Sequence, residues 1–342
     1  TLILTLFPYT TLFRSKQDVL RLLYSTVDKP LSGQDIAEQL NLSRTAVWKA
    51  IQQLKKDGYE ITSSTKVGYQ LSRQTDLLTL EGIRTHLGEE LQDWDIQVFE
   101  TTTSTNDLAK TYGASGSRVP TFFISEEQTA GRGRLGRTFL SPPKSGLYMS
   151  ICIFPEGDLD SISLITCATA VAATRAVESF IHEKIGIKWV NDLYYHEKKI
   201  AGILTEAVTN IEAQKVDALI VGMGINLHID DAIIPEDLKP IIGSLFSPQE
   251  IPDGFSRNEF VARFLKEWNH CYEDINAGKR DFMEEYKDHS IIVGKKINVI
   301  SGMKTYPATA KSVDNNGHLI VQTDDGAIHS LSYGEVSIRP EN

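Results

Sequence analysis

The stretch of sequence best suited to binding and chemistry is GRGRLGRT at residues 131–138. It interleaves three arginines with three glycines, between the apolar runs TFFISEEQ and GLYMSICIF. Glycines let a backbone wrap closely around a ligand, and guanidinium groups offer forked donors to phosphate oxygens. We therefore predict an anion clamp here. The alternative is a mobile, solvated basic loop.

The same residues match two nucleotide-binding patterns by spacing alone. These are G-x-G-x-x-G and, with Arg137 in place of lysine, G-x-x-x-x-G-K-[ST]. Both patterns need a helix whose N-terminus faces the phosphates. Pro142 and Pro143 follow closely and prevent an immediate helix, so we expect the arginines themselves to bind phosphate.

Three helices followed by a hairpin are predicted near the N-terminus. Apolar residues recur at helical spacing from residue 16 to about residue 27. Ser32 and Asp35 resemble a capping box that begins a second helix, and a third helix is indicated at residues 43–58. Two short β-prone runs with polar turn residues between them then predict a hairpin at residues 59–71.

Together these elements describe a winged helix-turn-helix at residues 16–73, whose third helix suits the DNA major groove. This segment has nine Lys and Arg against six Asp and Glu, although the whole chain has a formal net charge of -10. A basic N-terminal segment on an otherwise acidic chain suggests that nucleic acid contacts only this segment. The candidate DNA-binding residues are Arg44, Thr45, Lys49, Gln52 and Lys66. A small helical bundle used for protein contact is the alternative.

The rest of the chain predicts two further domains. Between residues 77 and 288, β-prone runs alternate with helical stretches, which indicates a mixed α/β domain with a sizeable core. Residues 291–340 contain short strands separated by Asn316-Gly317 and Asp325-Gly326 turns, as in a small SH3-like β-barrel. The expected fold class is therefore α+β multidomain, with a winged helix-turn-helix, a mixed α/β domain and a β-barrel in that order.

Composition fits a globular protein of two or three domains, with 342 residues, 41% of them hydrophobic and 23% charged. The three cysteines are widely spaced and form no C-x-x-C pair, so we expect neither a disulfide framework nor a zinc site, no metal-ligating residues of the protein, and a reduced, cytoplasmic setting. Residues 1–15 lack a basic n-region and a cleavage site, and Pro8 interrupts their apolar run. We expect them to be a non-native or disordered segment, not a signal peptide or membrane anchor.

Three motifs in order resemble those of the biotin–protein ligases: EEQTAGRGRLGR at 126–137, KWVNDLYYHEKKIAGILTE at 188–206 and VGMGIN at 221–226. The N-terminal domain resembles that of the bifunctional, repressor-type members, so the resemblance covers essentially all of residues 16–342. It implies a catalytic domain of the biotin/lipoate ligase type that forms biotinyl-5′-AMP from biotin and ATP with Mg²⁺. It also implies transfer to a lysine of a biotin carboxyl carrier protein, and repression at operator DNA by an adenylate-bound homodimer.

The resemblance also implies roles for residues by position. Those implied to form the biotin pocket are Ser104, Thr105, Asn106, Gln128, Gly131, Arg132, Lys199 and Gly222. Those implied around ATP and the adenylate are Arg134, Arg137, Phe139, Lys188, Asn191, Asn226 and Arg339. Catalysis is implied for Arg132, Arg134, Arg137, Lys188, Lys199 and Asp192, of which the last is expected to orient or deprotonate the acceptor lysine. For residues 104–106, a turn or helix cap is the alternative.

Two positions depart from the family's pattern. Phe139 stands where some members have tryptophan, and Val190 stands where proline is frequent. Phenylalanine can still stack on adenine, with less area and no N–H. Two other functions stay open: a lipoate–protein ligase, which would not be expected to have this arginine arrangement, and a winged-helix protein whose α/β domain only senses a small molecule. Retention of Lys188 and Lys199 argues against the second.

Overall fold

The computed structural model of the chain describes residues 7–26, 29–64, 67–72, 77–155, 161–210, 215–247, 251–252, 255–301 and 304–338. The chain divides into two compact units. Unit 1 comprises Thr1–Glu90 and Pro252–Arg263, and unit 2 comprises Leu91–Ile251 and Phe264–Asn342. The N-terminal helices therefore form a core separate from that of the large sheet.

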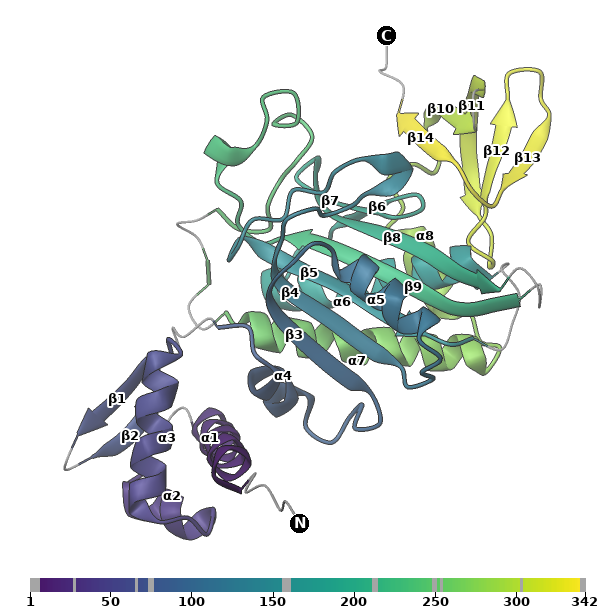
Figure 1. The fold of residues 1–342 in the computed structure, drawn as a ribbon. Coiled ribbons are helices and arrows are strands. Elements are labelled where there is room, and N and C mark those ends of the chain that lie inside the picture. Colours follow the sequence, from purple (N-terminus) through teal and green to yellow (C-terminus); the bar gives the residue numbers. More distant parts are fainter. Residues whose placement is uncertain are drawn as a thin grey trace. The chain divides into compact units, whose positions relative to one another are not determined.

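Unit 1 contains a cluster of helices and a two-stranded hairpin (Figure 1). Its elements are α1 (Phe7–Ser25), α2 (Gly33–Gln39), α3 (Arg44–Lys56), β1 (Ile61–Ser64), β2 (Gly68–Leu71), α4 (Leu80–Leu87) and the beginning of α7 (Arg257–Asn276). The apolar faces of α1, α2 and α3 meet in a core that includes Leu20, Ile36, Val47 and Leu54. This arrangement confirms the predicted helix-turn-helix domain.

Local signals set the ends of these helices. The Ser32 hydroxyl accepts from the Asp35 N–H at 3.1 Å and the Asp35 carboxylate accepts from the Ser32 N–H at 3.2 Å, which is the predicted capping box. Ser43 caps α3 through its side chain. The hairpin is tied to the segment before α2, because Tyr69 and Leu31 exchange two backbone hydrogen bonds of 2.9 and 2.8 Å.

The first helix begins earlier than the sequence indicated. Because α1 starts at Phe7, residues 7–15 are helical and not disordered as we had expected. Pro8 is compatible with this helix, since a proline in the first turn lacks only an N–H that would have no helical partner there. Among the side chains described in α1, the first that is buried is Val19. The non-native origin of residues 1–15 stays a prediction.

Residues 77–90 group with unit 1, although the sequence placed them at the start of the central domain. Within this unit α4 packs against α1. The side chain of Asn258 adds a further link, because it accepts from the Thr79 N–H at 2.9 Å and donates to the Leu77 carbonyl at 2.8 Å. Thr79 in turn caps α4 by accepting from the Gly82 N–H. Asn258 thus joins two segments of unit 1 that lie far apart in the sequence.

A seven-stranded mixed sheet forms the centre of unit 2 (Figure 1). Its strands, in spatial order, are β3 (Asp95–Thr102), β4 (Thr121–Gln128), β5 (Gly146–Ile153), β9 (Lys215–Asn226), β8 (Lys198–Asn210), β7 (Asp192–Tyr195) and β6 (Gly186–Lys188). The β3–β4 pair is parallel, and the other neighbours are antiparallel. This sheet confirms the predicted mixed α/β domain.

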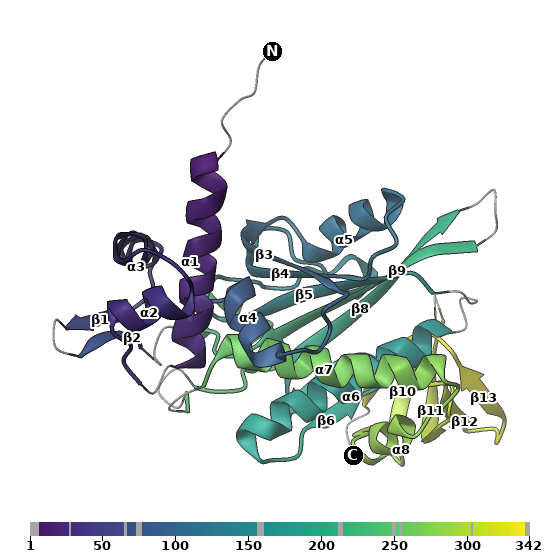
Figure 2. The ribbon, with the colours of Figure 1, turned by 90° about the horizontal axis from the view of Figure 1, so that it is seen from below.

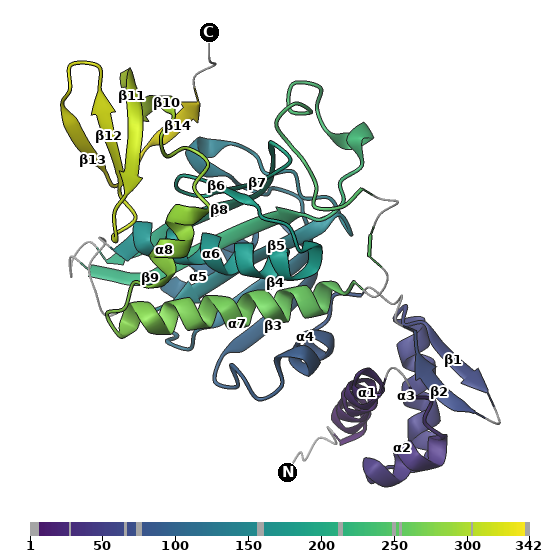
Figure 3. The same cartoon turned by 180° about the vertical axis from the view of Figure 1, so that it is seen from behind.

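Helices cover both faces of the sheet (Figures 2 and 3). On one face lies α5 (Thr105–Ala114), whose Ala109 belongs to a buried cluster with Phe123 and Ile220. On the other face lie α6 (Ser161–Ile181), the unit 2 part of α7, and α8 (Phe282–Asp288). By length and composition, α6 could cross a membrane, but 72% of its apolar window is buried, as in a core helix. The three cysteines are free and buried.

The C-terminal part of unit 2 is a five-stranded antiparallel sheet. Its strands, in spatial order, are β13 (Ile328–Leu331), β12 (Leu319–Thr323), β11 (Lys304–Val313), β10 (Lys296–Ser301) and β14 (Glu335–Ile338). The predicted turns are present, with Gly317 and Gly326 at φ values of 81° and 88°. Within the described residues β13 and β14 are the outer strands of this sheet, which is the small C-terminal β domain that the sequence predicted.

Candidate functional site

A cavity of about 540 Å³ opens in unit 2 where the Gly/Arg loop (residues 131–138) meets the sheet and β14. Almost all the site residues predicted from the sequence line it: Ser104, Thr105, Asn106, Gln128, Arg132, Arg134, Arg137, Phe139, Lys188, Asn191, Asp192, Lys199, Gly222 and Asn226. Gly131 lies behind this lining, where a Cβ would be 2.5 Å from the Phe139 carbonyl oxygen. Arg339 lies outside the described residues.

One end of the cavity is formed by uncharged polar groups. Ser104 stands at the N-cap position of α5, yet its side chain makes no capping hydrogen bond. Gln128, at the end of β4, instead holds the start of the helix: its Oε1 accepts from the Thr105 N–H at 2.8 Å and from the Thr105 hydroxyl at 3.1 Å. Its Nε2 donates to Ser141 at 3.0 Å. The amide and hydroxyl groups are therefore fixed before any ligand arrives.

Asn106 is held by a second set of hydrogen bonds at the same end. Its Nδ2 donates to Glu206 at 2.7 Å, and its Oδ1 accepts from the buried Ser150 hydroxyl at 2.6 Å. Lys110 neutralises Glu206 across 2.5 Å. Gly222 makes room for this arrangement, because a Cβ there would lie 2.0 Å from Asn106 Oδ1. The glycine is therefore needed for close approach, not for backbone freedom.

The Gly/Arg loop forms the opposite wall and has no following α-helix, which agrees with our rejection of the two nucleotide-binding patterns. It folds back on itself, with the Gly133 N–H bonded to the Arg137 carbonyl and the Phe139 N–H to the Gly131 carbonyl. Leu135 at its tip has a positive φ of 56° and is 73% exposed. The loop aims its guanidinium groups at neighbouring elements of the cavity.

Each arginine of the loop has a partner. Arg132 pairs with Asp107 of α5 at 2.7 Å. Arg134 donates to the Asn191 side chain at 2.8 Å and to the Gly334 carbonyl at 2.6 Å. Arg137 pairs with Glu335 of β14. The loop is thereby braced against three different parts of the chain.

Arg137 binds both carboxylate oxygens of Glu335, at 2.5 and 3.0 Å. The paired charges raise the pKa of Arg137 and lower the pKa of Glu335. Glu335 and the neighbouring Val336 were not predicted as site residues. A lone glutamate in a β-prone run gives no sequence signal of its destination.

The β7–β8 hairpin supplies a lysine and a carboxylate to the same cavity. Lys199 and Asp192 form an ion pair of 2.7 Å, although they are seven positions apart, because β7 and β8 are adjacent antiparallel strands. Asn191 is anchored beside them, with its Nδ2 donating to the Ile203 carbonyl at 2.9 Å. The peptide bond between Trp189 and Val190 is cis.

Aromatic rings complete the cationic end. The Phe139 ring packs directly over Gly224, where a Cβ would lie 2.4 Å from its edge. Lys188 Nζ lies 5.7 Å from the centre of the Tyr194 ring. Burial, with Asp192 and Glu335 nearby, raises the pKa of Tyr194 to about 12, so this tyrosine stays neutral.

A loop that the sequence did not single out closes the remaining side. It contributes Pro235, Leu238, Ile241 and Ile242. Backbone hydrogen bonds join it to the catalytic candidates, because the Lys199 N–H donates to the Ile241 carbonyl and the Gly243 N–H donates to the Lys199 carbonyl. Asn226 donates to the Gly243 carbonyl at 3.0 Å. Ile241 is 47% exposed although it is apolar, and no motif or periodicity in the sequence marks this loop as part of a site.

The cavity is thus lined by neutral polar groups at one end and by cationic groups at the other, and glycines of β8 and β9 (Gly202, Gly222 and Gly224) also line it. Such a site suits an elongated ligand with a small hydrogen-bonding ring at one end and negative charge at the other. No group of three or more metal-ligating side chains was found among the described residues. The arrangement favours chemistry that depends on positioning and neutralising anions.

On α3, the predicted DNA-binding residues occupy the outer face: Arg44, Thr45 and Lys49 are exposed, and Gln52 is half-buried. Trp48 lies among them and is 53% exposed, which we had not expected for so large an apolar side chain. Lys66 lies outside the described residues. The basic and polar surface of α3 is therefore available for contact.

Comparison with protein-family models matches all three predicted parts. A model of the biotin/lipoate A/B protein ligase family matches residues 98–226, an HTH domain model matches residues 15–70, and a model of the biotin protein ligase C-terminal domain matches residues 292–339. The order of the three agrees with the order of the domains seen here.

Individual proteins show the same similarity. The chain is 29% identical over 312 residues to the bifunctional ligase/repressor BirA of Bacillus subtilis, covering 91% of this chain and 95% of that protein. It is 28% identical over 318 residues to the bifunctional ligase/repressor BirA of Escherichia coli, covering 90% and 92%. Among solved structures, the biotin protein ligase from Aquifex aeolicus in complex with biotin and ATP superposes with a TM-score of 0.60 at 25% identity, covering 72% of this chain and 99% of that one.

Proposed function

We propose that this chain is a bifunctional biotin–protein ligase and biotin-dependent repressor whose central domain is of the biotin/lipoate A/B protein ligase family. It would join biotin to ATP as biotinyl-5′-AMP and then transfer biotin to a lysine of a biotin carboxyl carrier protein. The observation that carries the proposal is the cavity in which a neutral polar end and an arginine- and lysine-rich end face one ligand space. The buried free cysteines fit a cytoplasmic setting.

We place the ureido ring of biotin at the neutral end. A ureido ring presents two N–H donors and one carbonyl acceptor, and the residues there are hydroxyls and amides: Ser104, Thr105, Asn106 and Gln128. Their mutual hydrogen bonds hold them in position, so binding does not first have to order them. The biotin carboxylate then points toward Lys199.

In the first step, an oxygen of the biotin carboxylate attacks the α-phosphorus of ATP while the bond to pyrophosphate breaks. Both reactants are anions, so their approach requires neutralisation of charge. Lys199, Lys188 and the loop arginines supply it, with Phe139 placed to stack on adenine. Asp192 orients Lys199 through their 2.7 Å ion pair.

In the second step, the neutral amine of the acceptor lysine attacks the acyl carbon and AMP leaves. The amine must lose a proton, and of the two carboxylates that line the cavity, Asp192 and Glu335, we assign Asp192 to receive it. The step requires neither a serine nor a cysteine nucleophile.

Magnesium would accompany ATP. The carboxylates lining the cavity are Asp192 and Glu335, and each is ion-paired, with Lys199 and with Arg137. They fit a supporting role in which the phosphates hold most of the coordination sphere. The ion would neutralise phosphate charge beside the arginines.

The repressor activity is assigned to unit 1. Arg44, Thr45 and Lys49 on the outer face of α3 would meet the major groove of operator DNA. Lys66, which lies outside the described residues, stays a candidate for DNA contact from the sequence alone. We propose that the adenylate-bound protein dimerises, because one small winged helix makes few base contacts whereas a linked pair spans two half-sites.

One incubation tests the ligase assignment. The protein is mixed with labelled biotin, ATP and an apo carrier domain, and label on the carrier lysine is the expected result. A parallel incubation with lipoate tests the lipoate–protein ligase alternative, and a reaction without ATP is the control. Labelling by lipoate alone would reassign the substrate, and no labelling with either would favour a sensor without catalysis.

A further inference from the structure

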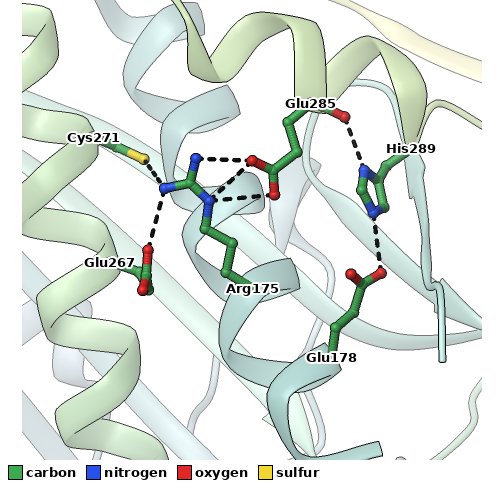
Figure 4. A network of polar contacts seen from close by, with 6 residues as sticks. All are labelled: Arg175, Glu178, Glu267, Cys271, Glu285 and His289. Atoms are coloured by element: carbon green, nitrogen blue, oxygen red, sulfur yellow. Dashed lines mark hydrogen bonds and ion pairs between the residues drawn. The ribbon is translucent and has the colours of Figure 1, made fainter. Parts of the chain in front are cut away.

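A network of charged side chains lies behind the sheet, outside the cavity, and joins α6, α7 and α8 (Figure 4). Arg175 of α6 is at its centre. Its guanidinium donates to both carboxylate oxygens of Glu285 on α8, at 2.8 to 3.3 Å, and to Glu267 on α7 at 3.2 Å. The three side chains are each about one-third exposed, so this network is partly shielded from water.

A second contact links α6 to the residue that ends α8 (Figure 4). The ring of His289 is 8% exposed, and its Nε2 lies 3.0 Å from the Glu178 carboxylate. Its Nδ1 lies 2.9 Å from the Glu285 carbonyl. Glu178 also accepts from the Ile185 N–H at 2.9 Å, just before β6. Two acidic residues, Glu178 and Glu285, thus fix the last turn of α8.

The segment that follows α8 continues directly into the sheet. The Ile187 N–H donates to the His289 carbonyl at 2.7 Å, and the Ile291 N–H donates to the Ile187 carbonyl at 3.0 Å. Residues 289–291 therefore pair with the edge strand β6. The fit is close, because a Cβ on Gly186 would lie 2.2 Å from the Ile291 side chain.

The strand that is held in this way carries cavity residues. Lys188 follows Ile187 directly, and Asn191 comes three residues later and accepts from Arg134. A fully buried tyrosine of α8, Tyr286, also donates to the Val190 carbonyl at 3.2 Å. The backbone of residues 187–190 therefore takes its position from α8, and α8 takes its own from α6.

We propose that Glu178, His289 and Arg175 are positioning residues for the ATP end of the site, and that they act through α8 and β6 on Lys188. This inference rests on the proposed ligase function. The neutral polar end of the cavity is built on α5 and β4, which have no part in this network. Loss of the network should therefore weaken ATP use and leave biotin binding unchanged.

The test compares His289→Ala with His289→Gln. The alanine variant loses the link to Glu178, whereas glutamine keeps an amide donor of similar reach. A misplacement of about 1 Å in an active site can cost about 100-fold in rate. His289 acts on Lys188 only indirectly, through one strand, so we expect a smaller effect in His289→Ala, a rise in the KM for ATP on the order of tenfold. The dissociation constant for biotin, measured without ATP, should stay within about twofold of wild type, and His289→Gln should recover most of the loss.

A matched control and a double variant sharpen the result. Lys184→Ala removes an exposed ion pair to the same helix, Lys184 to Asp288 at 2.6 Å, and should have no effect on the KM for ATP. If His289 acts through Lys188, the KM of the double variant His289→Ala/Lys188→Ala should match that of Lys188→Ala alone. Additive effects, or an equal loss of ATP and biotin affinity, would overturn the proposal.

Two further measurements keep the test decisive. If His289→Ala does not fold, Glu285→Gln keeps the side chain's size while removing its charge, and should raise the KM for ATP in the same selective way. Hydrogen exchange of the Ile187 amide, which needs no catalysis, should accelerate in His289→Ala. Unchanged exchange contradicts the positioning role, whereas failure of wild type to release pyrophosphate from ATP and biotin contradicts the ligase function instead.

Discussion

Arg137 and Glu335 form a two-pronged ion pair although 198 positions of sequence separate them, with oxygen–nitrogen distances of 2.5 and 3.0 Å. The pair joins the Gly/Arg loop to β14 at the rim of the cavity. A charge that is expected to meet ATP phosphates is therefore held by a carboxylate in this structure. The Arg137 guanidinium therefore contacts the C-terminal sheet and is also the group expected to bind phosphate.

The pair should make stability depend on pH in a defined window. Arg137 lowers the pKa of Glu335 in the folded protein below its unfolded value of roughly 4.3. The ion pair therefore contributes its full stabilisation at pH values above roughly 4.3, and this stabilisation is lost as the pH falls through the lower pKa of the folded protein. Because Arg137 is largely exposed, we expect at most about 1 kcal/mol. Urea unfolding of wild type and Glu335→Gln should differ at pH 6–7 and converge by roughly pH 3. A difference that is the same at every pH would contradict this.

Replacing Lys199 by alanine should leave the fold intact and reduce adenylate formation by on the order of 100-fold, because the cation nearest Asp192 is removed from a site that gathers several negative charges. Pyrophosphate release and circular dichroism would be measured together. The neighbouring Lys198 is exposed and does not line the cavity, so Lys198→Ala is the matched control. Normal release by Lys199→Ala would refute the assigned role.

Arg132→Ala gives a separate test of the Gly/Arg loop. Its partner Asp107 would be left without a counterion, but both side chains are partly exposed, so the melting temperature should change little. Adenylate formation should fall sharply because the clamp loses one donor to anionic ligands. A variant that forms adenylate at the wild-type rate would show that Arg132 only pairs with Asp107.

Gly222→Ala should weaken the binding of biotin and leave the binding of ATP unchanged. The added Cβ would lie 2.0 Å from Asn106 Oδ1, and overpacking of this kind costs about 1–3 kcal/mol, or roughly 5–150-fold in affinity. Isothermal titration with biotin and, separately, with ATP would measure both ends of the cavity in one variant. Equal weakening of both would mean that the substitution disturbs the sheet and not the pocket.

We expect operator binding to be coupled to formation of the adenylate. Operator affinity should rise when biotin and ATP are supplied together and should be lost when residues 16–73 are removed, while the truncated protein still labels its carrier. Analytical ultracentrifugation would follow dimerisation, and operator titration would follow DNA binding. Equal DNA affinity with and without adenylate would refute the coupling and leave the ligase assignment standing.

Prediction from sequence succeeded where local chemistry was decisive. The capping box at Ser32, the turns at Gly317 and Gly326, and the absence of a helix after the Gly/Arg loop all depend on residues within a few positions of one another. Most of the predicted site residues belong to three motifs, and the structure brings them together around one cavity with residues 104–106. The helix over residues 7–15 was not predicted, because we expected residues 1–15 to be non-native or disordered; Pro8 in its first turn is compatible with a helix.

Contributions from distant segments were not predictable in the same way. Glu335 reaches the cavity only because the C-terminal sheet docks beside the Gly/Arg loop, and residues 235–242 reach it because backbone hydrogen bonds tie them to Lys199. Within unit 1, the Asn258 side chain joins the beginning of α7 to residues 77–79, which lie far away in the sequence. None of these contacts leaves a periodic pattern or a motif, because each depends on tertiary packing.

The placement of Glu335 also orders events during synthesis. All the buried residues of the helix-turn-helix core have been made once the chain reaches Leu71, whereas a wall of the cavity is missing until β14 has been made. At roughly 5–20 residues per second, that interval is on the order of ten seconds or more. On the proposed function, we therefore expect a nascent chain to fold its N-terminal domain before its cavity can bind ATP, so that an unfinished polypeptide does not yet activate biotin.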